Sequence, residues 1–136
     1  MKSLIDTGFL FAVLDKKDGD HFLCSETLNS EVDPYLPEAV LPELAYLVLR
    51  DLGYEIWINF LGSLAAGELP IISTDISDII RAAEIMEQYR DSKIDYVDSV
   101  IMAIAERLDI KRILTVDRRD FGLFRPRHCD YFEILP

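Results

Sequence analysis

The chain has 136 residues, of which 50% are hydrophobic, and its formal net charge at pH 7 is −11. This length suits one domain with a substantial core, and this hydrophobic content is far above that of disordered chains. The acidic balance argues against a protein that coats nucleic acid by bulk electrostatic attraction. We therefore expect a single folded domain over residues 1–136.

Both cysteines, Cys24 and Cys129, stand alone in the sequence. Two isolated thiols form neither a disulfide framework nor a metal-ligand pattern, so we expect reduced thiols in the cytoplasm. The N-terminus reaches Asp6 before any apolar leader has formed, which predicts that no signal peptide is present. No apolar stretch approaches the ~20 residues that cross a bilayer, so no membrane partner is expected.

Short apolar runs alternate with longer amphipathic stretches along the chain. In the first half we expect a strand at 3–6, helices at 7–14 and 21–29, a turn at 33–34, a brief strand at 35–36, and helices at 37–51 and 54–66. Asp20 suits an N-cap, Pro37 the first turn of a helix, and Gly53 a helix end. In the second half we expect a strand at 69–73, helices that begin after Thr74 or Asp75 and after Asp95, and strands at 112–116 and 131–135.

Apolar residues at helical spacing predict which side of these later helices faces the core. In the helix that begins after residue 75, the stripe consists of Ile76, Ile79, Ile80, Ala83 and Met86. In the helix that begins after Asp95, it consists of Val97, Val100, Ile101, Ile104 and Leu108.

Strands that alternate with helices favour an α/β fold, a three-layer α/β/α sandwich with a central, mainly parallel sheet. Sites in open sheets of this kind lie at the carboxyl ends of the strands. Asp6 closes the first predicted strand, and Asp117 closes the strand that begins near Arg112. Two acids at two such ends indicate a shared site.

Four acids stand where an apolar run ends or a helix begins, namely Asp6, Glu43, Asp98 and Asp117, and Asp120 is a fifth candidate. Carboxylates that a fold brings together repel one another and raise each other's pKa. A hard cation such as Mg²⁺ or Mn²⁺, which takes oxygen ligands, relieves that repulsion. A carboxylate-held metal is a usual device for cutting a phosphodiester. We therefore interpret the acids as the site of a metal-dependent nuclease, with Asp6, Asp98 and Asp117 as metal ligands and Glu43 completing the catalytic set.

Each acid also has a purely structural explanation. Asp6 suits the N-cap of the helix that follows it, and Asp98 suits the third position of a helix capped by Asp95. Glu38 competes with Glu43, but it lies in a first turn, where the helix dipole accounts for a negative charge. The additional site candidates beside the main acids are Thr7, Thr115 and Asp120.

Basic residues concentrate near the C-terminal end of the chain. From Arg107 to Arg127 the sequence holds seven lysines and arginines but only three acids. A phosphate chain could approach this edge of an otherwise acidic molecule, although solvated arginines around a surface turn would give the same pattern. The candidates for RNA contact are Arg118, Arg119 and Arg125.

Several short motifs follow one another along the chain, and their order and spacing carry more information than any single motif. They are Leu4-Ile5-Asp6-Thr7, Asp20-His21, Leu41-Pro42-Glu43-Leu44, Asp98-Ser99 with Ala103 and Ala105, and Leu114-Thr115-Val116-Asp117-Arg118-Arg119-Asp120-Phe121. Together they resemble the PIN domain family, and within it the VapC-type toxin ribonucleases. The last motif is the most specific, and the resemblance covers nearly the whole chain. The sequence departs from the family at Gly8, where Ser or Asn is frequent, and at Ser99, where Ala is frequent, and neither change removes a carboxylate.

The resemblance implies a PIN-like fold whose acidic pocket, formed by Asp6, Glu43, Asp98 and Asp117, binds Mg²⁺ or Mn²⁺. It implies a metal-dependent endoribonuclease that cleaves RNA, a homodimer, and a cognate antitoxin that reaches into the pocket. The predicted function is therefore the toxin of a type II toxin–antitoxin pair. The alternative is a non-catalytic PIN-like module that binds a protein partner, which the loss of a pocket acid would have favoured.

Two other α/β families with acids at strand ends fit less well. A receiver domain would need a late strand followed by a lysine, and no such pair is evident. A haloacid-dehalogenase-type phosphatase would need Asp-x-Asp, whereas this sequence reads Asp6-Thr7-Gly8.

Overall fold

The computed structural model describes residues 1–136 without a gap. The strands are β1 (Lys2–Ile5), β2 (Asp33–Pro37), β3 (Ile71–Ile72), β4 (Arg112–Leu114) and β5 (Glu133–Leu135). The helices are α1 (Thr7–Leu14), α2 (His21–Ser30), α3 (Val40–Asp51), α4 (Tyr54–Ala65), α5 (Ile76–Gln88), α6 (Tyr96–Leu108) and α7 (Arg118–Leu123). A short 3-10 turn, η1 (Arg90–Ser92), lies between α5 and α6.

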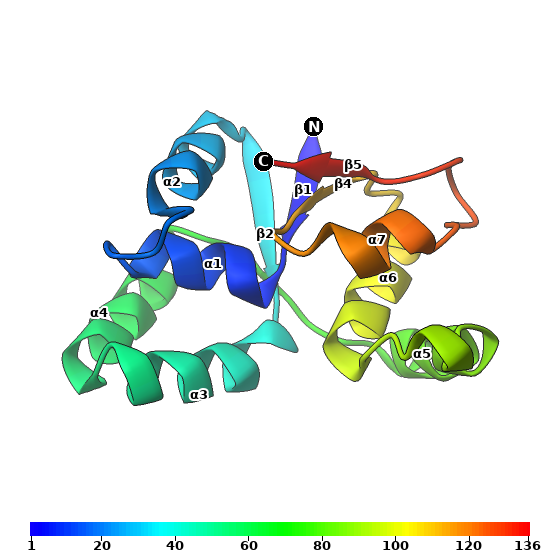
Figure 1. Ribbon diagram of the computed structural model, residues 1–136, viewed down its shortest axis with the longest axis horizontal. Helices are drawn as coiled ribbons and strands as arrows, with labels where there is room; N and C mark the ends of the chain where they lie inside the picture. Colours follow the sequence, from blue (N-terminus) through cyan, green and yellow to red (C-terminus); the bar gives the residue numbers. More distant parts are fainter.

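The five strands form one sheet in the order β3-β2-β1-β4-β5, and every pairing is parallel. Figure 1 shows helices α1 to α4 on one side of this sheet and α5 to α7 on the other. The central strand β1 is covered on both faces, so Leu4 and Ile5 are fully buried. The prediction of a three-layer α/β sandwich with a parallel sheet is confirmed.

Helix α6 supplies the largest part of the second layer's core. Val100, Ile101 and Ile104 are fully buried, as their helical spacing predicts. Leu108, at the C-terminal end of the same stripe, is exposed. The first layer contributes Leu44 and Val48 of α3, and both side chains are likewise fully buried.

Helix α3 begins at Val40 rather than at the predicted Pro37, because β2 continues through Pro37. The N–H groups of Leu36 and Glu38 each donate toward the β3 side at 2.8 Å. The intervening residue faces the other way, where the pairing with β1 has already ended. A proline there costs no ladder hydrogen bond, so it can end a strand as well as begin a helix. The turn expected at 33–34 is likewise part of β2.

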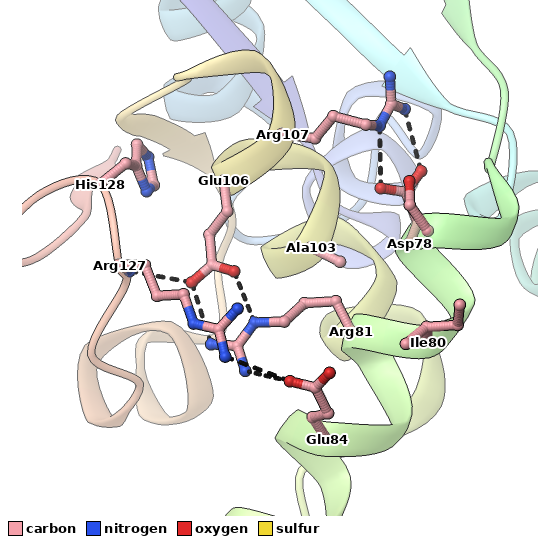
Figure 2. Close-up of a pocket in the computed structure, with 10 residues that line it drawn as sticks. Asp78, Ile80, Arg81, Glu84, Ala103, Glu106, Arg107, Arg127 and His128 are labelled. Atoms are coloured by element: carbon pink, nitrogen blue, oxygen red, sulfur yellow. Dashed lines mark hydrogen bonds and ion pairs between the residues drawn. The ribbon is translucent and has the colours of Figure 1, made fainter.

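The side of helix α5 that faces the protein interior is opposite to the side predicted from its apolar residues. Its buried residues are Asp78, Ala82 and Ile85. The predicted stripe is exposed instead and comprises Ile76, Ile79, Ile80, Ala83 and Met86. The prediction of a core-facing stripe is wrong because the opposite side of α5 faces α6, where Ala82 and Ile85 are buried in the core. Two ion pairs hold that side in place (Figure 2); they join Asp78 to Arg107 and Arg81 to Glu106.

The direction in which the chain leaves the sheet reverses between β1 and β4. Strands β2 and β3 lie on one side of β1, whereas β4 and β5 lie on the other. Ile5 pairs with Leu114, so the residues that follow these two strands are spatial neighbours. Ligand sites of open α/β sheets lie in the crevice outside such a reversal. Asp6 and Thr115 are the first residues of the chain to enter it.

None of the helices is long and apolar enough to cross a membrane.

The packing of α6 leads to a stability prediction. Because Ile101 is fully buried, Ile101→Ala should lower the free energy of unfolding by about 2–5 kcal/mol. Ile58 on α4, which is 54% exposed, is the control. Ile58→Ala should change the free energy of unfolding by roughly 0.5 kcal/mol or less. Urea unfolding monitored by circular dichroism would measure both, and equal losses would contradict the burial described for α6.

Candidate metal centre

Asp6 directly follows β1 and is the N-cap of α1. Its backbone N–H donates to Leu114 O at 2.9 Å, which extends the pairing of β1 with β4 by one residue. Its Oδ1 accepts the Thr7 N–H at 2.7 Å, and its Oδ2 accepts the Thr115 hydroxyl at 2.8 Å. The residue is only 7% exposed. The fold thus orients both oxygens, and each keeps a lone pair for a cation.

Thr115 connects the two strand ends. Its hydroxyl donates to Asp6 and accepts the Asp117 N–H at 3.0 Å. Its own N–H donates to Leu135 O at 2.8 Å, which ties it to β5. The other threonine candidate differs, because the Thr7 hydroxyl is buried without any hydrogen-bond partner and only its backbone holds Asp6.

Asp98 lies in the first turn of α6, where the N-cap Asp95 accepts its backbone N–H at 2.9 Å. The Ser99 hydroxyl donates to the Asp95 carbonyl at 2.7 Å and fixes the same turn. Because Asp95 performs the capping, the Asp98 carboxyl is not needed for it. That carboxyl is turned into the protein and is 6% exposed.

Helix α7 brings two more acids to the same place. Asp117 is its N-cap, accepting the Arg119 N–H at 3.1 Å, and Asp120 lies one turn on and is 5% exposed. One carboxylate oxygen from each of Asp98, Asp117 and Asp120 lies within 4.8 Å of the others. The structure therefore gathers Asp98 with Asp117 and adds Asp120. Asp6 lies outside this closest group, although its charge acts on Asp98.

Burial and like charges raise the pKa of two of these acids. Desolvation, followed by the charges of Asp6, Asp95 and Asp120 and a hydrogen bond to Asp120, raises the pKa of Asp98 to about 10. Desolvation raises the pKa of Asp6 to about 6, despite the hydrogen bonds from Thr115 and Thr7 that lower it. A bound cation would oppose both shifts, because its positive charge stabilises the ionised carboxylates. The donor set thus fits a hard divalent ion.

Glu43 and Asp95 border the site. Glu43 lies in the first turn of α3 and is exposed, and its charge contributes to the raised pKa of Asp6. Asp95 is exposed and caps α6, as expected, but its charge also raises the pKa of both Asp6 and Asp98. From the sequence, Asp95 is expected only as the cap of α6. The signal that was available is the pair of acids, Asp95 and Asp98, within one turn.

Arg119 is the only basic residue that pairs with an acid of the site. Its Nη1 lies 2.5 Å from Asp120 Oδ1, and its Nη2 donates to Ser92 O at 2.5 Å. Arg118 instead contacts the carbonyl oxygens of Ile134 and Pro136. Arg125 Nη1 donates to Gly122 O at 2.8 Å.

The raised pKa values lead to a prediction about pH and stability. Asp98 and Asp6 have a higher pKa in the folded chain than the ordinary value of 3.8 expected for the unfolded chain, so folding tightens their hold on a proton. The stability they contribute is therefore present below about pH 4 and is lost as pH rises toward the folded pKa values. Asp98→Asn should raise the melting temperature of the metal-free protein at pH 8, because it removes the free-energy cost of protonating Asp98 on folding; each kcal/mol removed should give roughly 3–5 °C.

The same gain should be much smaller at pH 4, where the folded wild-type carboxyl is protonated and the unfolded one is about half protonated. Differential scanning fluorimetry at the two pH values would measure it. Asp130→Asn, at an exposed acid in the loop before β5, is the matched control and should leave both values unchanged. A gain that is larger at pH 4 than at pH 8 would contradict the assignment.

The chain is similar to known proteins along most of its length. The PIN domain family model matches residues 3–124. Ribonuclease VapC26 of Mycobacterium tuberculosis (strain ATCC 25618 / H37Rv) is 33% identical over 134 residues, which cover 98% of this chain and 99% of that protein.

Two solved structures of proteins from Mycobacterium tuberculosis share the fold. VapC20, described as a sarcin-ricin loop cleaving toxin, has a TM-score of 0.82 at 17% identity and covers 98% of this chain and 99% of its own. VapBC-5, a member of the VapBC family of toxin-antitoxin systems, has a TM-score of 0.60 at 19% identity over 98% and 97% of the two chains. With its family match and its full-length relative, the chain belongs to the PIN domain family.

Proposed function

We propose that this protein is a metal-dependent endoribonuclease that acts as the toxin of a type II toxin–antitoxin pair. The observation that carries the proposal is the 33% identity to a ribonuclease along 98% of the chain. The group of carboxylate oxygens within 4.8 Å of one another supports the metal dependence.

In this proposal Asp6, Asp98, Asp117 and Asp120 hold a Mg²⁺ or Mn²⁺ ion, with Glu43 at the rim. Carboxylate oxygens are the hard donors that both ions prefer. When bound, such an ion neutralises the acids, polarises a phosphoryl oxygen and lowers the pKa of a coordinated water.

The protein's own contribution is orientation and proton release. Thr115 and the Thr7 N–H hold the two oxygens of Asp6 in a fixed direction, so little reorganisation accompanies binding. Asp98 carries a proton near neutral pH in the metal-free protein, because its pKa is raised to about 10. It must give up that proton to act as a ligand, and metal binding is therefore coupled to proton release.

Three arginines are the proposed contacts for the RNA backbone. Arg118 and Arg125 form no ion pair with an aspartate or a glutamate and donate only to backbone oxygens, so their charge is available to phosphates. Arg119 pairs with Asp120 beside the proposed metal ligands. Phosphate contacts of this kind position a strand without reading its sequence.

The proposed partners are a cognate antitoxin and a second copy of the chain. VapBC-5, which shares the fold, belongs to a family of toxin-antitoxin systems, and this supports an antitoxin for the present protein. For the homodimer, the support is the exposed stripe of α5, because an apolar helix face without a partner is typical of an interface. Both cysteines are free thiols, which agrees with the proposed cytoplasmic location.

Loss of a pocket acid should abolish cleavage without unfolding the protein. Asp6→Asn and Asp98→Asn should each reduce RNA cleavage by about 100-fold or more, since each removes an anionic oxygen from the metal centre. Both should also weaken Mn²⁺ binding in calorimetry. Asp130→Asn, outside the site, should behave as the wild type. Cleavage that persists in the two pocket variants would reject these acids as the catalytic site, whereas a wild type without cleavage would favour the non-catalytic binding module.

A charge on the exposed face of α5 should disrupt self-association. Ile79→Glu together with Ile80→Glu should convert a dimer into a monomer, because the substitution places two carboxylates in an apolar contact. Size-exclusion chromatography with light scattering would measure the mass. Ile58→Glu on α4, at a similarly exposed isoleucine, is the control. A wild-type monomer at micromolar concentration would reject the homodimer.

A further inference from the structure

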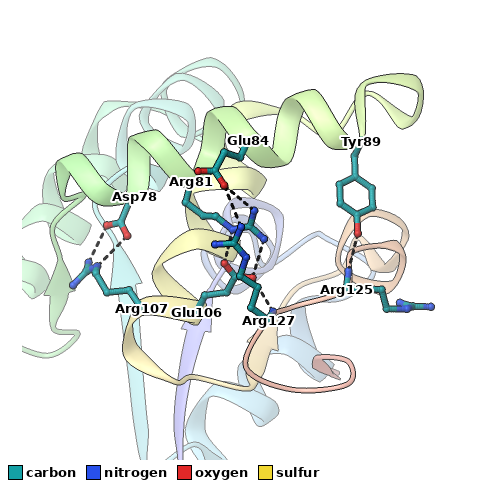
Figure 3. Close-up of polar contacts among 8 residues, drawn as sticks. All are labelled: Asp78, Arg81, Glu84, Tyr89, Glu106, Arg107, Arg125 and Arg127. Carbon is teal, nitrogen blue, oxygen red and sulfur yellow. Dashed lines mark hydrogen bonds and ion pairs between the residues drawn. The ribbon is translucent and has the colours of Figure 1, made fainter.

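The segment that follows α7, residues 124–127, is attached to α5 and α6 through its backbone. The Arg127 N–H donates to Glu106 Oε2 at 2.9 Å, and the Arg125 N–H donates to the Tyr89 hydroxyl at 3.1 Å. Figure 3 shows both contacts, with Tyr89 beside Arg125 and Glu106 beside Arg127. Pro126, between the two attachment points, is buried.

Glu106 is held in place by a second residue. Arg81 Nε donates to Glu106 Oε1 at 2.7 Å, and Arg81 Nη2 donates to Oε2 at 3.2 Å. The side chains are 13% and 9% exposed, so this pair is largely removed from water. The Arg81 guanidinium also lies over the ring of Phe124, 5.9 Å from its centroid. Arg81 and Glu106 thus contact the segment after α7 from two directions.

A similar ion pair on the same two helices makes none of these contacts. Arg107 Nε and Nη2 each lie 2.9 Å from an oxygen of Asp78, and Asp78 is 1% exposed. Arg107 otherwise contacts only Asp75 and Ser73 O, which precede α5. Figure 2 shows the two pairs side by side between α5 and α6. Helix packing alone therefore does not require the contacts that Glu106 makes.

Helix α7 needs such support because it is short. Its six residues are too few to be stable without tertiary contacts. Its apolar anchor is Phe121, whose ring packs edge-on against Phe132 at 6.2 Å. Phe124 then packs against both Phe132 and Tyr89, at 6.0 and 5.5 Å. These contacts, together with the link to β4, determine where α7 presents Asp117 and Asp120.

We propose that Glu106, with Arg81 and Tyr89, is a positioning unit that fixes α7 so that Asp117 and Asp120 reach Asp98. The inference rests on the proposed metal-dependent function. These residues contact the chain after α7 rather than the acids themselves, and they act through the backbone of residues 124–127. A displacement of a site residue by about 1 Å is enough to weaken a preorganised site severely.

The test compares Glu106→Ala with Asp78→Ala. Each substitution leaves one arginine of the α5–α6 interface without its buried partner, so both should lower thermal stability. The first readout is the Mn²⁺ dissociation constant, measured by calorimetry at a temperature where both variants are folded. The second is hydrogen exchange of the amides of residues 117–125 in the metal-free proteins, which requires no metal and no activity.

Glu106→Ala should weaken Mn²⁺ binding by about 10-fold, the usual effect of losing a residue that supports metal ligands. It should also speed exchange selectively in residues 117–125. Asp78→Ala should change neither. Glu106→Gln, which keeps an acceptor for the Arg127 N–H, should recover most of the affinity. Should Glu106→Ala fail to fold, Tyr89→Phe removes the other acceptor and should speed exchange in the same residues.

Equal effects of the Glu106 and Asp78 variants on both readouts would overturn the positioning role and leave only a contribution to stability. A wild-type protein that binds no Mn²⁺ would instead overturn the proposed function. The exchange comparison would still decide whether Glu106 fixes α7, so the two failures are distinguishable.

Discussion

The hydrogen bond from the Thr115 hydroxyl to Asp6 joins the two strand ends on which the site depends. It can form only because β1 and β4 are adjacent and parallel, with Ile5 opposite Leu114. One residue beyond that pair, the chain turns away from the sheet on both strands and toward opposite layers. The space beyond these strand ends receives Asp6 from the first layer's side, and Asp98 and Asp120 from α6 and α7 of the second. Strand order thus determines which acids can meet, and local hydrogen bonds determine how they point.

Such a site works against the stability of the fold around it. Desolvation and like charge raise the pKa of Asp98 and Asp6, so the metal-free pocket at neutral pH is a place where the native state is destabilised. The hydrophobic core next to the site offsets this loss of stability, because Leu4, Ile5, Val100 and Ile101 are fully buried. A cation at these carboxylates would relieve their repulsion, and that relief would add to the binding free energy.

Sequence patterns predict the features that depend on neighbouring residues, but they do not predict an orientation that depends on ion pairs between distant residues. The alternation of strands and helices, the caps at Asp6 and Asp95, and the acids at two neighbouring strand ends follow from hydrophobic period and capping chemistry. The membership of Asp120 in the acidic group does not, since capping explains an acid in the first turn of α7 equally well. The orientation of α5 is also unpredictable locally. It depends on pairing Asp78 with Arg107, 29 residues away.

Helix α5 shows why a reversed amphipathic helix can be useful. A buried apolar face would have packed against α6 with little geometric preference, because hydrophobic contact is non-directional. Hydrogen bonds to a carboxylate are directional. The Glu106 carboxylate accepts two from Arg81 and one from the Arg127 N–H, and these bonds link α5, α6 and the chain after α7. The apolar residues left outside are then free to contact another molecule. The inner face of α5 thus serves the geometry of the acids, and its outer face remains available for assembly.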